Sequence, residues 1–358
     1  MIDIFNQPRQ RPDRRTRMAL KVEDWPLDDQ RRWSDAFLKG DVFEAGDGAH
    51  LAPSTRTSWE NEYGTWLGFL GRSDATALNE ALDARVTRER ITEYCSVLAQ
   101  TNSAYSIAGR VEKLRHALRL LSPETDWEWL LIISKRINAR AAPRPKGPRY
   151  QDIGNLSILG FKLMEDAQSR TNEEQPLSLN TALAFRDGLV IAVTAATSLR
   201  RRNLAQMTIR THLVRMGSGW RVCFEGSETK NKQPLEMPLP PELSPYIDFY
   251  LSSNRGIFAG ADQHHAVWAS AKGGALKAGA ICDLVCARTK AEFGRATNPH
   301  MFRDAAATSF SIHSPESVLA AADLLGHKGF RHTQKHYIRA GGVEAARLLA
   351  QALRKKTR

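Results

Sequence analysis

The stretch Asn298-Pro299-His300-Met301-Phe302-Arg303-Asp304 guides the interpretation of the whole chain. Asn298 is a good helix N-cap and Pro299 suits the first helical position, so we expect a helix to begin here. His300 and Arg303 are three residues apart and share one face of that helix. A helix start with histidine and arginine beside its free N–H groups is suited to an anion, most often a phosphate. Alone the pattern is weak, because surface histidines and arginines without a ligand are common.

The composition indicates a globular protein with a polyanionic partner. The chain has 358 residues, of which 42% are hydrophobic and 25% are charged, enough for two or three ordinary domains. The 51 lysines and arginines exceed the 39 acidic residues, which gives a net charge of +12. The resulting pI of about 9.7 favours nucleic acid as the partner.

Cysteine usage and hydropathy predict a reduced, cytoplasmic protein. The four cysteines, at positions 95, 223, 282 and 286, form no C-x-x-C pair, and the N-terminus lacks a signal-like apolar core. The best apolar run, 188–197, is about half of the roughly 20 residues that a membrane span needs. We expect it to be a buried helix, and we expect no membrane partner.

Four segments follow from the patterning of the chain. Residues 1–27 are rich in arginine and proline and predict a flexible basic arm, which either contacts a partner or is merely a solvated tail. Residues 28–140 predict a small all-helical domain with one basic side. Residues 141–152 are basic and proline-rich, as in an interdomain linker. Residues 153–358 predict a second domain.

Apolar residues recur at helical spacing through the first domain. We expect one helix from about 54 that Gly71 stops, a second over 85–99 and a third over 105–121. Trp127 and Trp129 begin a last helix and belong to the core, rather than to a base-stacking surface. The third helix has a basic face, made of Arg110, Lys113, Arg115 and Arg119.

Some of these basic residues are candidates for contacts with a phosphate backbone. Arg110 and Lys113 come from the helical domain, and the linker adds Arg144, Lys146 and Arg149. A linker with this charge could lie along a nucleic acid, although a solvated connector has the same composition.

The second domain combines helices with a small sheet. Helices are expected over 153–168, 179–197, 241–252, 274–293, 299–312, 315–325 and 333–340. Residues 208–214 and 220–224 are strand-like and flank a glycine turn, and 235–239 would add a third strand after a polar turn. The predicted fold class is therefore mainly α with a small antiparallel β-sheet (α+β).

Further charged residues occupy element ends. Arg200 follows an expected helix that ends in Ala196-Thr197-Ser198-Leu199, and Lys230 and Lys232 lie in the polar turn between the second and third strands. His327 follows Leu324-Leu325-Gly326, which has a helix-ending glycine. Three other residues are candidates for the same site: Arg201 and Arg202, which follow Arg200, and Tyr337, which lies ten residues after His327.

The order of these motifs resembles that of the tyrosine recombinases, or phage integrases. T-S-L-R followed by N-L, a lysine eight residues before the proline of M-P-L, H-M-F-R, L-L-G-H and a downstream tyrosine all occur in that order, over about 197–337. The preceding helical region is similar in size and position to the core-binding domain of that family.

The resemblance implies a role for each residue. Tyr337 would attack a scissile DNA phosphate to give a 3′-phosphotyrosyl bond, and Arg200 and Arg303 would stabilise the charge that develops. Lys230 would protonate the leaving 5′-oxygen, and His300 would accept the tyrosine proton or support the phosphate. His327 would hydrogen-bond a phosphate oxygen. The covalent intermediate conserves the bond energy, so neither ATP, a metal nor any other cofactor is expected.

The chain departs from the family pattern at several positions. Ser198 stands where glycine is usual and Asn203 where an acidic residue is usual. The step from His327 to Tyr337 is one residue longer than the commonest spacing, and Lys232 competes with Lys230 as the catalytic lysine. His332 and His336 have zinc-like spacing, but no third ligand is evident.

The expected partners are duplex DNA, further copies of the chain in a homotetramer on DNA, and an accessory directionality factor. The basic arm favours a mobile-element integrase. Type IB topoisomerase-like relaxation and a non-cleaving DNA-binding regulator are the alternatives, and RNA binding lacks a stacking motif. An amphipathic tail, 343–353, would pack either on a neighbouring protomer or on its own domain.

Overall fold

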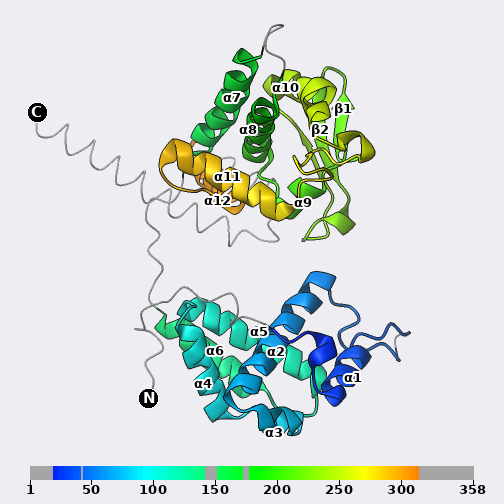
Figure 1. Cartoon of the computed structure of the whole chain (residues 1–358), viewed down its shortest axis with the longest axis vertical. Coiled ribbons are helices and arrows are strands. Elements are labelled where there is room, and N and C mark those ends of the chain that lie inside the picture. The colour runs from blue at the N-terminus through cyan, green and yellow to red at the C-terminus, as the bar shows by residue number, and fades with distance from the viewer. Residues whose placement is uncertain (1–18, 42, 142–150, 172–176, 314–358) are drawn as a thin grey trace, which may run out of the picture. The chain divides into compact units, whose positions relative to one another are not determined.

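The structure, a computed structural model, describes residues 19–41, 43–141, 151–171 and 177–313. The chain divides into two compact units, Met1–Pro145 and Lys146–Arg358 (Figure 1). The predicted helices 315–325 and 333–340, the tail 343–353 and His332 and His336 lie outside the described residues.

The first unit is entirely helical over its described part. Its aromatic-rich core includes the fully buried Trp66, Tyr94 and Leu114. Trp127 is 3% exposed, so its predicted place in the core is confirmed. The helices of this unit are α1 (Leu27–Asp35), α2 (Pro53–Ser73), α3 (Leu82–Arg85), α4 (Arg88–Ala99), α5 (Ala104–Leu121) and α6 (Glu128–Arg140).

Three predictions for this unit were wrong in detail. Residues 19–27 belong to the folded unit rather than to a flexible arm, since Trp25 is 3% exposed. Gly71 does not stop α2, which continues for two further residues. The predicted helix over 85–99 is divided at Thr87, whose hydroxyl accepts a 3.2 Å hydrogen bond from the backbone N–H of Arg90 and so caps α4.

The second unit is built around α8 (Leu179–Thr197), which lies in its middle in Figure 1. Among the described residues, α8 is the one helix long and apolar enough to cross a membrane, but 67% of its most apolar 18-residue stretch is buried inside the structure. It is the buried helix that the sequence predicts. The other helices are α7 (Ile153–Ser169), α9 (Arg201–Gln206), α10 (Ser244–Phe249), α11 (Ala278–Phe293) and α12 (Pro299–His313).

Two glycines let α7 and α8 cross closely. A Cβ atom on Gly160 would lie 2.7 Å from the backbone nitrogen of Ala192, and one on Gly188 would lie 2.7 Å from the carbonyl oxygen of Gly160. These distances are too short for any side chain, so both positions require glycine. The close crossing anchors α8, and the C-terminal end of α8 leads into the site described below.

The predicted sheet is present, with a shorter first strand. Its strands β1 (Leu213–Met216), β2 (Gly219–Phe224) and β3 (Leu235–Pro238) are antiparallel in the order β1-β2-β3. Thr208 and Ile209 form only isolated β-bridges, and residues 210–212 form a turn with Arg210 at φ +71°, which is incompatible with an extended strand. The fold class, mainly α with a small antiparallel sheet, is confirmed.

Glycines also set the bounds of α11. The helix predicted over 274–293 begins only at Ala278, because Gly273 and Gly274 have φ of +85° and +72° and form a turn. The helix ends at Phe293 and is followed by Gly294 at φ +70°, a left-handed C-cap.

Candidate active site

The start of α12 has the geometry that its sequence predicts. The side-chain oxygen of Asn298 accepts hydrogen bonds from the backbone N–H groups of His300, at 3.0 Å, and Met301, at 3.2 Å. His300 is exposed on this first turn, whereas Arg303 is only 7% exposed. The two predicted phosphate-seeking side chains therefore share a helix end, one in solvent and one mostly buried.

Arg303 connects α12 to the turn between α8 and α9. Its Nη1 donates a 2.6 Å hydrogen bond to the backbone carbonyl of Ser198. Ser198 ends α8 in the left-handed conformation at φ 49° and is 1% exposed. Because Arg200 follows two residues later, this hydrogen bond brings the predicted arginines into one site.

Burial and mutual repulsion disfavour the charges of these arginines. The pKa of Arg303 is lowered to about 10, chiefly by burial and then by the nearby charge of Arg200. Burial also lowers the pKa of Arg200, which is half-buried. An anion between the two guanidinium groups would offset both effects, because its negative charge favours the charged form of each arginine.

The two candidate lysines lie on the loop between β2 and β3. Lys230 and Lys232 are both exposed, and neither forms an ion pair with the described part of the chain. Asn203 of α9 donates a 3.1 Å hydrogen bond from Nδ2 to the carbonyl oxygen of Glu228 in this loop. Since α9 begins directly after Arg200, this contact draws the lysine loop toward the arginine pair.

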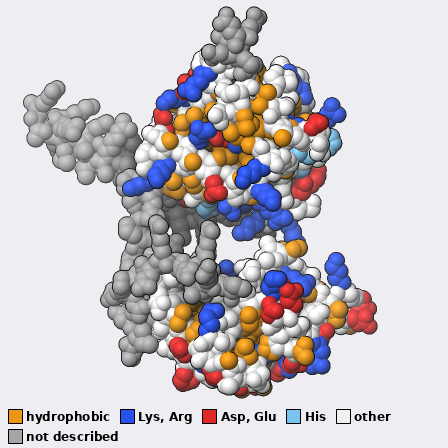
Figure 2. Space-filling model, viewed as in Figure 1, with side chains coloured by type: hydrophobic (Ala, Val, Ile, Leu, Met, Phe, Trp, Pro, Cys, Tyr) orange, Lys and Arg blue, Asp and Glu red, His pale blue; other side chains and the backbone are white. Residues whose placement is uncertain are grey.

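The structure brings some predicted site residues together and leaves others outside its description. Arg200, Arg303 and His300 belong to adjoining helix ends, and the lysine loop is tied to the same region. Figure 2 shows Lys and Arg side chains gathered at the edge of the second unit where α9 lies, and Arg201 and Arg202 are exposed there. His327, Tyr337, Arg144, Lys146 and Arg149 lie outside the described residues.

The predicted basic face of α5 is only partly exposed. Lys113 and Arg119 are exposed, but Arg115 is 6% exposed and paired with Glu128, so its predicted place on an open face was wrong. Arg110 is engaged inside the unit: its Nη2 lies 3.2 Å from the Glu62 carboxylate and 3.3 Å from the Tyr94 hydroxyl.

The sequence interpretation missed two residues that shape the lysine loop. His212, 7% exposed, lies 2.9 Å through Nε2 from a carboxylate oxygen of Glu228. Glu228 also completes a reciprocal helix-capping pair with Glu225. The E-x-x-E spacing at 225–228 is the signal that could have located the cap. A lone histidine before a strand has no comparable signal.

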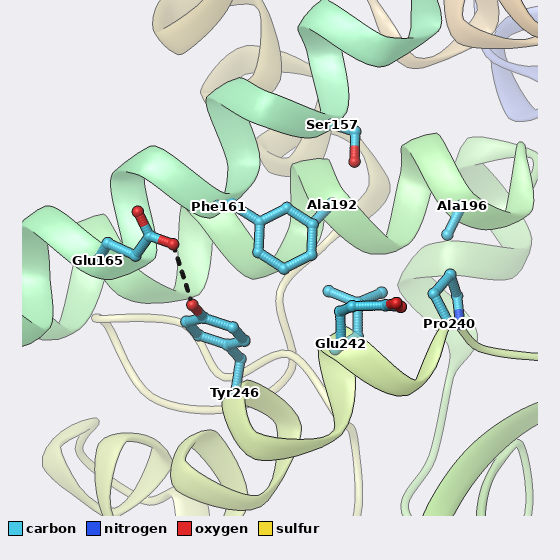
Figure 3. A pocket seen from close by; sticks show the side chains of 9 residues that line it. Ser157, Phe161, Glu165, Ala192, Ala196, Pro240, Glu242 and Tyr246 are labelled. Carbon is cyan, nitrogen blue, oxygen red and sulfur yellow. Dashed lines mark hydrogen bonds between the residues drawn. The ribbon is translucent and has the colours of Figure 1, made fainter.

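An open pocket of about 480 Å³ lies elsewhere on the second unit (Figure 3). Phe161 of α7 and Ala192 of α8 line it, together with the carboxylates of Glu165 and Glu242. Glu165 accepts a 3.2 Å hydrogen bond from the Tyr246 hydroxyl. Two carboxylates would repel a phosphate, so this pocket is not the anion site.

Within the described residues, no three His, Cys, Asp or Glu side chains come together as a metal ion would require. The groups available at the site are cations, a histidine and backbone dipoles. Such groups stabilise and protonate a phosphate ester directly.

Two neighbouring arginines beside a lysine-bearing loop, on a mainly helical unit with a small antiparallel sheet, form a site whose charge suits a phosphate group. Residues 168–341 match the phage integrase family, so this stretch of the chain is a phage integrase domain. The family predicted from the ordered motifs is thereby confirmed.

Two solved structures share the fold. The XerH site-specific recombinase bound to difH substrate, in a pre-cleavage complex, is 15% identical with a TM-score of 0.56, over 92% of this chain and 96% of that one. The XerH complex with a palindromic difH substrate, after cleavage, is 15% identical with a TM-score of 0.54, over 89% and 93%. A search of the curated proteins finds no match.

Proposed function

We propose that the chain cleaves and rejoins duplex DNA through a 3′-phosphotyrosyl intermediate, with Tyr337 as the nucleophile. The observation that carries this proposal is the arginine pair. Arg303 is buried with its pKa lowered to about 10, and the charge of Arg200 contributes to that shift. Two desolvated cations side by side are costly unless an anion joins them.

The charge of the scissile group explains why two arginines are needed. A phosphodiester has one negative charge, and attack by a phenolate builds a second on the pentacoordinate phosphorus. Guanidinium groups stay charged at neutral pH and donate paired hydrogen bonds to phosphate oxygens. Because Arg303 is already oriented by the Ser198 carbonyl, it needs little rearrangement to meet that charge.

Proton transfers are assigned to groups at the rim of the site. Lys230 is the general acid for the leaving 5′-oxygen, with Lys232 as its competitor. His300, exposed on the first turn of α12, accepts the tyrosine proton or supports the phosphate, and His327 hydrogen-bonds a phosphate oxygen. No metal or nucleotide enters the scheme, because rejoining reverses the covalent step.

Duplex DNA is the proposed partner, and phosphate contacts supply most of the affinity. The exposed Arg201 and Arg202 lie on the same short helix as Asn203, next to the arginine pair. Lys113 in the first unit and the basic residues of 141–152 are further proposed phosphate contacts. Affinity of this kind falls steeply as salt rises, because each neutralised phosphate releases counterions.

The biological role we propose is that of a cytoplasmic mobile-element integrase, which acts as a homotetramer on two duplexes with an accessory directionality factor. The XerH structures are complexes with difH substrates, which supports DNA as the substrate class. The basic composition of residues 1–27 supports an integrase over a chromosome-resolving enzyme.

The nucleophile is tested with a duplex selected by the full chain from a randomised pool and then nicked near its centre to trap the covalent product. Wild-type protein should form a covalent adduct in denaturing gels, and Tyr337→Phe should form none. An adduct of undiminished yield with Tyr337→Phe would overturn the assignment of the nucleophile.

A second assay separates recombination from relaxation. Two labelled duplexes that carry the selected site should exchange strands, and a supercoiled plasmid without the site should stay supercoiled. Relaxation without exchange would instead identify topoisomerase-like activity. Binding to the selected duplex with neither reaction would identify a non-cleaving regulator.

A further inference from the structure

One residue, Glu228, holds the lysine loop at three points. Its Oε2 accepts a 2.9 Å hydrogen bond from the backbone N–H of Glu225, and its Oε1 lies 2.9 Å from Nε2 of His212. Its carbonyl oxygen accepts the 3.1 Å hydrogen bond from Asn203. Both carboxylate oxygens and the backbone are therefore engaged, two residues before Lys230.

The contacts of His212 fix which ring nitrogen carries the proton. The backbone N–H of Thr208 lies 3.1 Å from Nδ1, and the Thr208 hydroxyl lies 2.8 Å from the same atom. A backbone N–H can only donate, so Nδ1 is the acceptor and Nε2 carries the proton. Nε2 therefore donates to Glu228, and this hydrogen bond is the main reason that the pKa of Glu228 is lowered.

His212 lies where the sheet ends and the loop begins. It directly precedes β1, and its carbonyl oxygen accepts a 2.9 Å hydrogen bond from the backbone N–H of Cys223 in β2. Its ring packs on Phe224, the last residue of β2, with centroids 4.6 Å apart. These contacts hold the imidazole in place, and through it the sheet is connected to the β2–β3 loop.

The side chain of Lys230 is less constrained than the loop that carries it. Lys230 is exposed and forms no ion pair with the described residues, whereas the loop around it is closed by the Thr229 hydroxyl, which donates to the carbonyl of Gln233 at 2.7 Å. A flexible side chain on a fixed loop suits a group that must reach a leaving oxygen and deliver a proton.

We propose that His212 is a positioning residue for the general acid: through Glu228 it holds the β2–β3 loop so that its lysine reaches the leaving 5′-oxygen. The inference rests on the proposed function, in which a loop lysine protonates that oxygen. Loss of the His212–Glu228 hydrogen bond should impair proton delivery and leave phosphate binding by the arginines unchanged.

The test compares two versions of the selected, nicked duplex, one with the natural 5′-oxygen at the scissile phosphate and one with a bridging sulfur. A thiolate leaves without protonation, because a thiol is far more acidic than an alcohol. His212→Leu should cleave the oxygen substrate about tenfold or more slowly than wild type, and the sulfur substrate within about twofold. Glu228→Ala should show the same selectivity, and Lys230→Ala should show it more strongly.

Two further variants separate positioning from folding. His212→Gln places an amide N–H near the position of Nε2 and should recover most of the oxygen-substrate rate. Val222→Ala shortens a fully buried side chain in the same sheet and leaves the loop residues unchanged. It should therefore lower the cleavage rates of both substrates equally or lower neither rate.

The outcomes distinguish failure of the inference from failure of the proposed function. The positioning role is overturned if His212→Leu slows cleavage of both substrates equally, or does not slow cleavage of the oxygen substrate, while the sulfur substrate still restores the cleavage rate of Lys230→Ala or Lys232→Ala. If sulfur rescues neither lysine variant, the general-acid assignment itself is wrong.

Discussion

Arg303 donates a 2.6 Å hydrogen bond from Nη1 to the backbone carbonyl of Ser198, which lies 105 residues earlier in the chain. This contact orients the buried guanidinium of Arg303, provides a donor for the backbone carbonyl at the end of α8 and brings α12 beside Arg200. The same contact holds Arg303 where its charge is disfavoured, since its pKa is lowered to about 10. The proposed catalytic charge of Arg303 is therefore held at a cost in stability.

Arg303→Met should raise the stability of the free protein and abolish cleavage. The lowered pKa corresponds to a cost of about 3 kcal/mol for the charge at neutral pH. The lost hydrogen bond offsets about 1–3 kcal/mol of that, so we expect a net gain of about 1 kcal/mol and a Tm higher by about 2–4 °C. Scanning calorimetry gives the Tm, and the nicked-duplex assay gives the cleavage rate.

Sulfate provides the control for this prediction. It should raise the Tm of wild type by binding between the arginines, and it should have much less effect on Arg303→Met. A Tm lower than wild type by several degrees would show that the hydrogen bond to Ser198 outweighs the cost of the charge.

Ser198→Gly should stabilise the second unit. Ser198 has φ 49°, a conformation that costs a residue with a side chain about 1 kcal/mol and costs glycine almost nothing. The carbonyl that Arg303 uses is a backbone atom and is retained, so cleavage should persist. Denaturant unfolding should show the gain, whereas Ser157→Gly within α7 should cost about 1 kcal/mol. Equal losses for both variants would contradict the prediction.

Arg110→Ala and Lys113→Ala, on the same helix, should have different effects. Arg110 compensates the buried Glu62, which is 5% exposed, so its loss should destabilise the first unit by about 3 kcal/mol. Exposed Lys113 should change stability by less than about 0.5 kcal/mol but should weaken DNA binding and reduce the salt dependence. Calorimetry measures the stability of each variant. Binding to the selected duplex at several salt concentrations measures the affinity for DNA and its salt dependence.

The Arg110 defect should depend on pH with a defined sign. Burial already raises the pKa of Glu62, and loss of Arg110 removes an opposing charge and raises it further. A carboxyl group with a raised folded-state pKa destabilises the fold above that pKa, and the penalty disappears as pH falls toward the unfolded value of about 4.5. The difference between Arg110→Ala and wild type should therefore shrink from pH 7 to pH 5. A constant difference would exclude Glu62 as its origin.

Asn203→Asp should lower activity although the acidic residue is the one usual in the family. Asn203 donates through Nδ2 to the carbonyl of Glu228, and a carboxylate at 3.1 Å would set two acceptors against each other. We expect a cost of about 1–3 kcal/mol in loop stability and slower cleavage of the oxygen substrate. Comparison with Asn203→Ala isolates the repulsion, and an Asp variant as active as wild type would show that the donor is dispensable.

Local signals predicted much of the fold. The N-cap Asn298 and Pro299 fixed the start of α12, because capping depends on residues next to each other in the chain. Glycines were less reliable. Gly71 was expected to end α2 but lies within it, while Gly274 was expected within a helix but has φ +72° and precedes it. Glycine fits helices, turns and caps, so its effect depends on packing that one sequence does not show.

The candidate site was predicted as a set of residue types but not as a set of contacts. Arg200, Lys230, His300 and Arg303 came from motif order. The Ser198 carbonyl that accepts from Arg303 and the histidine that holds Glu228 are joined only by tertiary packing. Arg110 shows the opposite error, since an arginine on a polar helix face also serves as the partner of a buried carboxylate.

The long separation between Ser198 and Arg303 bears on how the enzyme is made. Translation proceeds at about 5–20 residues per second, so the 105 residues between them take on the order of 5–20 s to synthesise. For most of that interval, once residue 234 has been made, the nascent chain has Arg200 and the lysine loop but not the second arginine. A chain released before residue 303 lacks the second arginine, so the arginine pair forms only when this late part of the chain has been made.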